Sequence, residues 1–250
     1  MSLAFVIASD YEDMSRRAAA RILDLIRHRP TLTIALPTGE TPRRMYHFLA
    51  DGLNAYGPAS SEIRFVNLDE FLGFPQHHPC SFARELRGHL FDRLKHRPTR
   101  IRLLDGGADD PAAECEEHEH WIQKQGGLDL AVLGIGANGH IAFNEPGTSF
   151  DRRTHVSRLA DSTIAEVERT CRAQPVPTHA LTMGIRTIVD AKQILLLASG
   201  RSKATVLRDA LLGDVCPAMP ASALQGHSRL AIIADESASG KMPAWFQPNP

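Results

Sequence analysis

The residues best suited to acid–base chemistry follow a glycine-rich turn in the middle of the chain. The segment GIGANG, residues 134–139, is followed by His140, Asn144 and Glu145. A carboxylate close behind a histidine can fix the tautomer of its imidazole, an arrangement typical of a general acid or base. A histidine beside a glycine turn can also be purely structural, and the residue pattern alone leaves both interpretations open.

The apolar run LDLAVL, residues 128–133, precedes this turn and predicts a strand buried on both faces of a parallel sheet. Ligands of open α/β sheets bind beyond the carboxyl ends of the strands, where this turn would lie. The turn also matches the dinucleotide-binding pattern G-x-G-x-x-G, with Asp161 near the expected acidic position. We disfavour a nucleotide site because Pro146 and Gly147 end any helix soon after the turn.

Other apolar runs alternate with segments of helical periodicity along the chain. The additional strands are predicted at residues 3–8, 31–36, 63–68, 193–198 and 230–234. This alternation predicts an α/β fold with a single doubly wound, mostly parallel sheet flanked by helices, forming one domain over residues 1–250. The Arg-rich stretch 151–177 predicts a helical lid over the site, with a solvated charged face as the alternative.

The predicted strand at residues 63–68 carries two carboxylates, Asp69 and Glu70, to its carboxyl end. Adjacent side chains of an extended strand point to opposite faces. We therefore expect one carboxylate to enter a cleft and the other to bind a neighbouring loop or water. Asp69 is the candidate catalytic residue, and a solvated acid pair is the alternative.

Two other strand ends carry residues that suit an anion. Thr41 can cap a helix that starts at Pro42, which leaves N–H groups for a phosphate, although capping alone explains the same residues. Lys203 falls in a first helical turn, where a cation opposes the helix dipole unless an anionic ligand balances it. The predicted substrate- and phosphate-binding residues are Thr38, Gly39, Glu40, Thr41 and Lys203.

The composition argues against several classes of partner. A net charge of -1 over 250 residues gives no electrostatic case for nucleic acid. No apolar run approaches the roughly 20 residues needed to span a bilayer, so we expect no membrane partner. The N-terminal segment lacks the pattern of a signal peptide, so we expect a cytoplasmic location. The widely spaced cysteines predict reduced thiols. They are Cys80, Cys115, Cys171 and Cys216.

A metal site is a weak alternative at the histidines of the EHEH cluster. His118 and His120 are two residues apart and diverge on a helix, whereas zinc-binding pairs usually sit three to five apart. We therefore predict no metal.

Taken together, these segments resemble the glucosamine-6-phosphate deaminase (isomerase) family over about residues 32–236. LPTGETP resembles the phosphate loop of the family, NLDEF its Asp-Glu block and SGRSKA its lysine loop. The signature GIGANGHIAFNEPGTSF is the most specific, because HIAFNEP separates this branch from the related sugar-phosphate lactonases. The likeness is strongest to the shorter bacterial members.

The resemblance implies a cofactor-free conversion of glucosamine 6-phosphate and water to fructose 6-phosphate and ammonia, by aldose–ketose isomerisation and deamination. It implies that His140 assists ring opening, that Glu145 orients and charges the imidazole, and that Asp69 moves the C2 proton toward C1. Asn138, where many members have an aspartate, completes the implied catalytic set. The alternatives are a sugar-phosphate lactonase of the same fold, or a deaminase-like protein with an altered substrate or a binding-only role.

Departures from the family pattern bear on the phosphate and on assembly. Glu40 replaces a small residue, and a carboxylate there would repel a phosphate. Ile164 stands where the family brings an arginine to the phosphate, so Lys203, Thr41 and backbone N–H groups are the expected anion ligands. His155 and Ser157 replace basic residues that bind an effector in hexameric members, which predicts a monomer or a small homo-oligomer.

Overall fold

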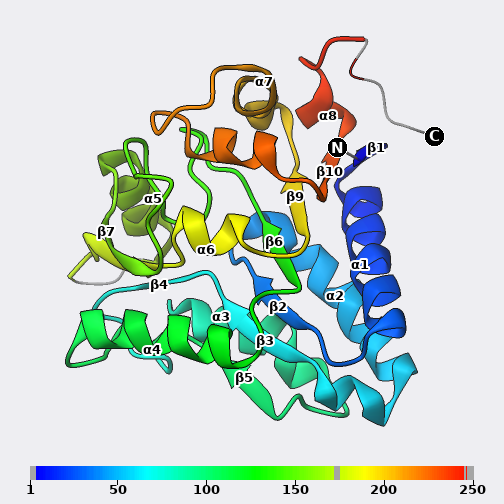
Figure 1. Ribbon diagram of the computed structural model, residues 1–250, viewed down its shortest axis with the longest axis vertical. Coiled ribbons are helices and arrows are strands. Elements are labelled where there is room, and N and C mark those ends of the chain that lie inside the picture. The colour runs from blue at the N-terminus through cyan, green and yellow to red at the C-terminus, as the bar shows by residue number, and fades with distance from the viewer. Residues whose placement is uncertain (1–3, 172–174, 245, 247–250) are drawn as a thin grey trace.

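The computed structural model of the protein describes residues 4–171, 175–244 and 246. Within these residues, a sheet of seven parallel strands forms the centre, in the order β1-β10-β9-β6-β2-β3-β5 (Figure 1). The mostly parallel sheet predicted from the sequence is confirmed, and β5 is a strand that the apolar pattern did not reveal. In chain order the strands are β1 Ala4–Ala8, β2 Thr33–Leu36, β3 Arg64–Asn67, β5 Arg100–Arg102, β6 Leu130–Leu133, β9 Ile194–Ala198 and β10 Leu230–Asp235.

Helices cover both faces of this sheet, as a doubly wound fold requires. Ile34 and Leu36 of β2 pack with α1, α2 and α3 on one face, whereas Ala35 packs with α4, α6 and α7 on the other. The strands are apolar on both faces because both are buried. The helix bounds are α1 Tyr11–His28, α2 Glu40–Tyr56, α3 Phe82–His89, α4 Pro111–Lys124, α6 Ile185–Val189 and α7 Ala204–Leu212.

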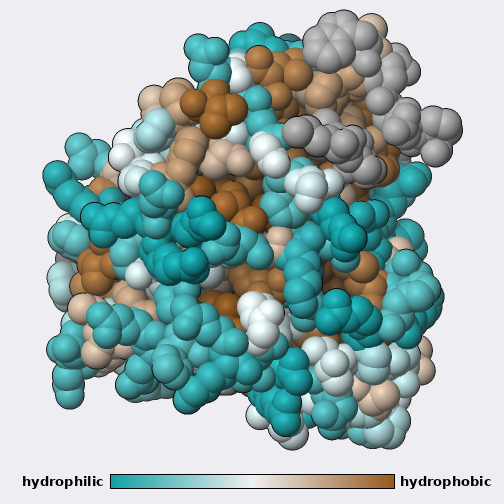
Figure 2. Space-filling view, viewed as in Figure 1, coloured by the Kyte–Doolittle hydropathy of each residue, from teal (hydrophilic) through white to brown (hydrophobic). Residues whose placement is uncertain are grey.

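Short helices fill the connections between these elements. Hydrophilic side chains cover most of the face seen in Figure 2, and hydrophobic ones gather in its upper part, around α7 and the chain that follows it. None of the described helices is both long enough and apolar enough to cross a bilayer. The short elements are η1 Pro58–Glu62, η2 Phe91–Arg93, η3 Arg201–Lys203, η4 Pro220–Gly226 and α8 Glu236–Ser239.

A second, antiparallel sheet stands beside the carboxyl ends of the central strands. It consists of β4 (Asp69–Phe71), β8 (His179–Thr182) and β7 (His155–Arg158), in that order. The segment 151–177 was predicted to be helical, and this is wrong for β7, because that strand completes the hydrogen bonds of β8. The helical part is α5 (Asp161–Cys171), and residues 172–174 lie outside the described residues.

The prediction of four reduced cysteines is wrong for one pair. Cys80, in the loop before α3, forms a disulfide with Cys171, the last residue of α5, with their Cα atoms 5.8 Å apart. Cys115 and Cys216 are free thiols. The pairing could not be predicted from the sequence because the two residues are 91 positions apart and meet only through the fold.

Candidate active site

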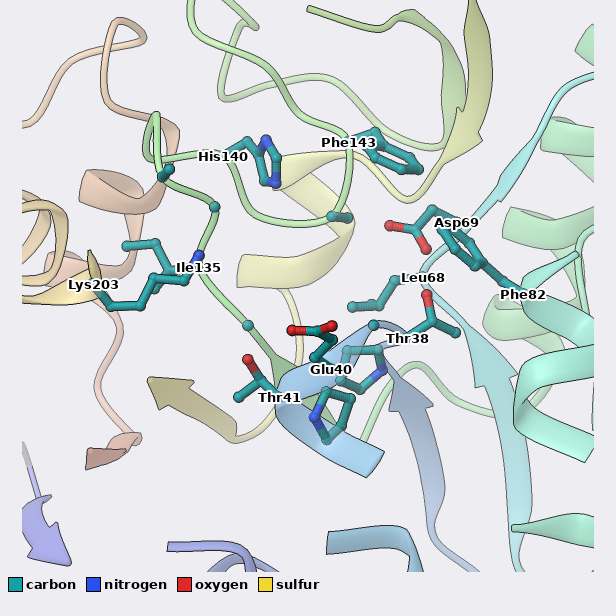
Figure 3. A pocket seen from close by; sticks show the side chains of 17 residues that line it. Thr38, Glu40, Thr41, Leu68, Asp69, Phe82, Ile135, His140, Phe143 and Lys203 are labelled. Atoms are coloured by element: carbon teal, nitrogen blue, oxygen red, sulfur yellow. The ribbon is translucent and has the colours of Figure 1, made fainter. Parts of the chain in front are cut away.

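A cavity of about 270 Å³ lies beyond the carboxyl ends of β2, β3 and β6, where the loops that follow these strands meet (Figure 3). In the sheet, β2 lies between β3 and β6, so the three loops converge on one place. The cavity is lined by all five predicted phosphate-binding residues and by two of the four predicted catalytic residues. These are Thr38, Gly39, Glu40, Thr41, Lys203, Asp69 and His140.

Asp69 begins β4, and its side chain points into the cavity from the wall that also carries Phe82 (Figure 3). The residue is 7% exposed, and burial raises the pKa of Asp69 to about 7, with the Glu85 carboxylate adding to the rise. A carboxyl group that titrates near neutrality can accept a proton and return it at physiological pH. The structure confirms that one carboxylate of the pair enters a cleft, and the role of Asp69 as the base stays a prediction.

Glu70 points to the opposite side of β4 and binds a neighbouring loop, as the strand geometry predicted. Its carboxylate accepts backbone N–H groups of Phe71, Phe82 and Ala83 at 3.0, 2.9 and 2.9 Å. Burial raises the pKa of Glu70 to about 8, although these three donors oppose the shift. Glu70 therefore ties the first turn of α3, and with it Phe82, to the strand that carries Asp69.

His140 is placed by the glycine turn that follows β6. The turn is closed by a hydrogen bond of 2.9 Å from Gly136 N to His140 O, and Gly139 has a φ of 88°, a conformation that favours glycine. A Cβ atom at Gly136 would clash with the imidazole ring of His140. The glycines therefore shape the loop that carries His140, because a loop and not a long helix follows them.

Behind His140 lie the other two predicted catalytic residues, Asn138 and Glu145, which do not line the cavity. Glu145 Oε2 is 3.3 Å from His140 Nδ1 and accepts a hydrogen bond of 2.7 Å from Asn138 Nδ2. Asn138 Oδ1 in turn accepts the His140 backbone N–H at 3.2 Å. Burial opposes ionisation of Glu145, but hydrogen bonds from His140, Asn138 and Thr163 outweigh it and lower its pKa to about 2. The imidazole therefore faces a permanent negative charge at Nδ1, which leaves Nε2 for the cavity side.

The loop after β2 forms the floor of the cavity. Helix α2 begins at Glu40 behind Gly39, whose φ is 91°. The prediction that Thr41 caps a helix starting at Pro42 is wrong, because the glycine turns the chain two residues earlier and no side chain caps α2. The Gly39 N–H donates to Glu85 Oε1 at 3.0 Å. The exposed Glu40 carboxylate stands in the cavity beside Thr41 (Figure 3).

Lys203 reaches the cavity from the wall opposite Asp69, next to Ile135 (Figure 3). It ends η3, directly before α7, and the loop that leads to it is held by Asp235 of β10. Asp235 accepts hydrogen bonds from Ser199 Oγ at 2.5 Å and from the Gly200 N–H at 3.0 Å. Among the residues described as lining the cavity, Lys203 is the one lysine or arginine.

Ile164 belongs to a cluster of apolar side chains next to the cavity, not to the cavity wall. It packs with Phe71, Phe143, Leu159 and other residues of this aromatic cluster, which lies under α5. At this position α5 therefore contributes an apolar contact that holds the helix in place, and no cation.

Sequence reasoning missed two residues that contact the predicted site. Glu85 accepts the N–H of Gly39 from a position 46 residues away, and Thr163 donates to Glu145 from 18 residues away. Glu85 carried one usable signal, because it is an acidic residue in the first turn of a helix that follows the Asp-Glu block. A threonine in a polar helix carries no such signal.

Solved structures of other proteins share this fold. A monomeric glucosamine-6-phosphate deaminase superposes with a TM-score of 0.89 at 39% identity, covering 96% of this chain and 100% of that one. A 6-phosphogluconolactonase from Trypanosoma cruzi superposes with a TM-score of 0.80 at 19% identity, over 97% of this chain and 98% of that one, which is a likeness of fold. The chain therefore has the fold of the α/β enzymes built on this type of sheet.

The match to a known family extends over most of the chain. Residues 9–232 match the model of the family described as glucosamine-6-phosphate isomerases/6-phosphogluconolactonase, and the chain belongs to this family. A glucosamine-6-phosphate deaminase of Halalkalibacterium halodurans is 44% identical over 241 residues, covering 96% of this chain and 98% of the relative. A glucosamine-6-phosphate deaminase of Rhodopirellula baltica is 41% identical over 234 residues, covering 93% of each chain.

Proposed function

We propose that this protein is a glucosamine-6-phosphate deaminase, which converts glucosamine 6-phosphate and water to fructose 6-phosphate and ammonia without a cofactor. The observation that carries the proposal is the placement of Asp69 and His140 on two walls of one small cavity (Figure 3). Relatives that cover nearly the whole chain and bear that name support the same reaction.

The geometry suits an acid–base sequence of steps. His140, with its Nδ1 paired to Glu145, moves a proton between the ring oxygen and the C1 hydroxyl so that the sugar ring opens. Asp69 then takes the proton from C2 and returns it to C1, while the C1 carbonyl oxygen gains a proton and the amine gives one up, which leaves a hydroxyl on C1 and an imine at C2. Water adds to C2 of this imine, the C–N bond breaks, and ammonia leaves with the ketose as the second product.

The phosphate of the substrate is assigned to the side of the cavity formed by the α2 loop and Lys203. Thr38, Thr41 and the start of α2 offer hydroxyl and N–H donors there, and Lys203 offers a positive charge. Glu40 stands in the same part of the cavity and opposes an anion. The arginines of α5 and β7 do not compensate for this, since neither Arg158 nor any other described arginine lines the cavity.

Ammonia release is the test of this function. Purified protein is incubated with glucosamine, galactosamine and mannosamine 6-phosphates and with the three unphosphorylated sugars, and ammonia and ketose are measured together. We expect equal amounts of both products from glucosamine 6-phosphate. Hydrolysis of 6-phosphogluconolactone without ammonia release would identify a lactonase instead, and tight sugar-phosphate binding without turnover would identify a binding protein.

We propose that this enzyme is a monomer or a small homo-oligomer and that it is located in the cytoplasm. The structural relative at a TM-score of 0.89 is described as monomeric. His155 and Ser157 lie on β7, at the positions where the family resemblance places the basic effector-binding residues of hexameric members. Light scattering of the purified protein at assay concentration measures its mass directly, and a hexamer would contradict the proposal.

A further inference from the structure

The two oxygens of Glu145 are held by different parts of the chain. Oε2 contacts the glycine turn, where it accepts a hydrogen bond from Asn138 and faces His140 Nδ1. Oε1 contacts the start of α5, where it accepts a hydrogen bond of 2.9 Å from Thr163 Oγ1 and one of 3.3 Å from the Ala160 N–H. The carboxylate is therefore a bridge between the loop that carries the imidazole and the first turn of α5.

The hydrogen bonds to Oε1 restrict the orientation of the Glu145 carboxylate. Rotation about the terminal bond of Glu145 would move Oε2 away from His140, and the bond between Oε1 and Thr163 opposes that rotation. Thr163 suits this task because its β-branch leaves few rotamers for the hydroxyl. The Ala160 N–H lies just before α5, where the partial positive charge of the helix end favours an anion.

Helix α5 is in turn fixed to the body of the protein along its length. Ile164 and Val167 pack into the aromatic cluster that contains Phe71 and Phe143, and Cys171 is bonded to Cys80. The position of the Thr163 hydroxyl is thus set by contacts that do not involve His140. A rigid helix that donates to the buried oxygen of a carboxylate can hold the other oxygen against an imidazole.

We propose that Thr163 is a positioning residue for ring opening, because its hydroxyl fixes the Glu145 carboxylate against His140 and so couples α5 to the catalytic imidazole. The inference rests on the proposed deaminase function, in which His140 opens the sugar ring. Thr163 does not line the cavity, so we expect it to make no contact with the substrate. It acts through Glu145.

The first test compares variants of α5 on the closed-ring substrate. Thr163→Ala and Thr163→Val should lower kcat about ten- to a hundredfold, the cost of losing a hydrogen bond to a charged group, with KM within about twofold of the wild type. Thr163→Ser keeps the donor and should restore kcat. Ser162→Ala is the matched control, because Ser162 is exposed on the same turn and should not change kcat. Far-ultraviolet circular dichroism and thermal melting confirm that each variant is folded.

The second test asks whether Thr163 acts through Glu145. In the Glu145→Gln background, adding Thr163→Ala should lower kcat by less than about twofold further, because the two side chains contribute as one unit. The full loss in both backgrounds would overturn the proposal, as would a Thr163→Ala enzyme with wild-type kcat.

A third measurement keeps the inference separate from the proposed function. The ring ¹⁵N signals of His140, assigned by comparison with His140→Gln, report the tautomer and the pairing of Nδ1 without any substrate. These signals should change in Thr163→Val and stay unchanged in Ser162→Ala and Thr163→Ser. Identical His140 signals in all variants would overturn the inference, whereas absence of ammonia release by the wild type with changed signals in Thr163→Val would overturn only the proposed function.

Discussion

Replacing Asp69 with asparagine should make the protein inactive and more stable at the same time. Asparagine keeps the shape of the side chain but cannot act as a base, so we expect isomerisation to fall about a hundredfold or more. The same change removes a charge from a site that is 7% exposed and in which no described residue donates a hydrogen bond to the carboxylate. In the wild-type protein, burial therefore disfavours the ionised form of Asp69, which is the form that the reaction needs.

The size of this effect follows from the pKa of Asp69. A rise from 3.8 in the unfolded chain to about 7 in the folded protein means that the unfolded state loses its proton first as the pH increases. The free energy of unfolding therefore falls between these two pH values, by about 4 kcal/mol once the pH is above both. About 2.5 kcal/mol of that loss develops between pH 5 and pH 8. Asp69→Asn removes this loss.

The assay is urea unfolding of the wild type and Asp69→Asn at pH 5 and pH 8. The gain in the free energy of unfolding caused by the substitution should be about 2.5 kcal/mol larger at pH 8 than at pH 5. A difference between the two pH values cancels the constant cost of burying the new amide group. Equal effects of the substitution at both pH values would show that Asp69 has an ordinary pKa and would refute the reasoning.

The same pKa controls the activity of the wild type. The value of kcat/KM should fall below an apparent pKa near 7, because Asp69 must be ionised to accept the C2 proton. Glu85→Gln removes the neighbouring negative charge that helps to raise this pKa, so the acid limb should move to lower pH. An unchanged acid limb in Glu85→Gln would assign that limb to another group.

Three further outcomes are expected. His140→Gln should slow turnover of the closed-ring sugar about a hundredfold while leaving an open-chain analogue nearly unaffected, and equal slowing of both would move His140 to the proton-transfer step. Glu40→Gly should lower KM for glucosamine 6-phosphate about five- to tenfold but leave KM for unphosphorylated glucosamine unchanged, because it removes a carboxylate from the phosphate side of the cavity; a rise in KM would show that Glu40 binds the sugar. Reduction with dithiothreitol should lower the free energy of unfolding by about 2 to 5 kcal/mol, because the bond between Cys80 and Cys171 closes a long loop, and the double serine variant should start at the lower value and not respond to dithiothreitol.

The central sheet could be predicted because buried parallel strands are continuous apolar runs bounded by turn residues. The run at residues 128–133 became β6 and the run at 193–198 became β9. The second sheet could not, because β4 is three residues long and begins with two carboxylates, and β7 is largely polar. Such strands form because neighbouring strands offer hydrogen bonds, which is tertiary information.

The residues of the site also fall into a group that could be predicted from the sequence and a group that could not. Asp69 and His140 could be predicted because each follows a strand directly, and the fold brings carboxyl ends of neighbouring strands together. Glu85 and Thr163 could not, because their roles arise from contacts across 46 and 18 residues of chain. The start of α2 was misplaced since a glycine with positive φ replaced the expected threonine cap.

The attachment of α5 at its two ends is unequal, with a covalent bond at Cys171 and hydrogen bonds at Thr163 and Ala160. The end at Cys171 and the buried Val167 are held without any contribution from the site, whereas the start of the helix is held through the Glu145 carboxylate. A substitution that removes the Oε1 partners of Glu145 should therefore loosen the first turn of α5 and the His140–Glu145 contact together, and leave the far end of the helix in place.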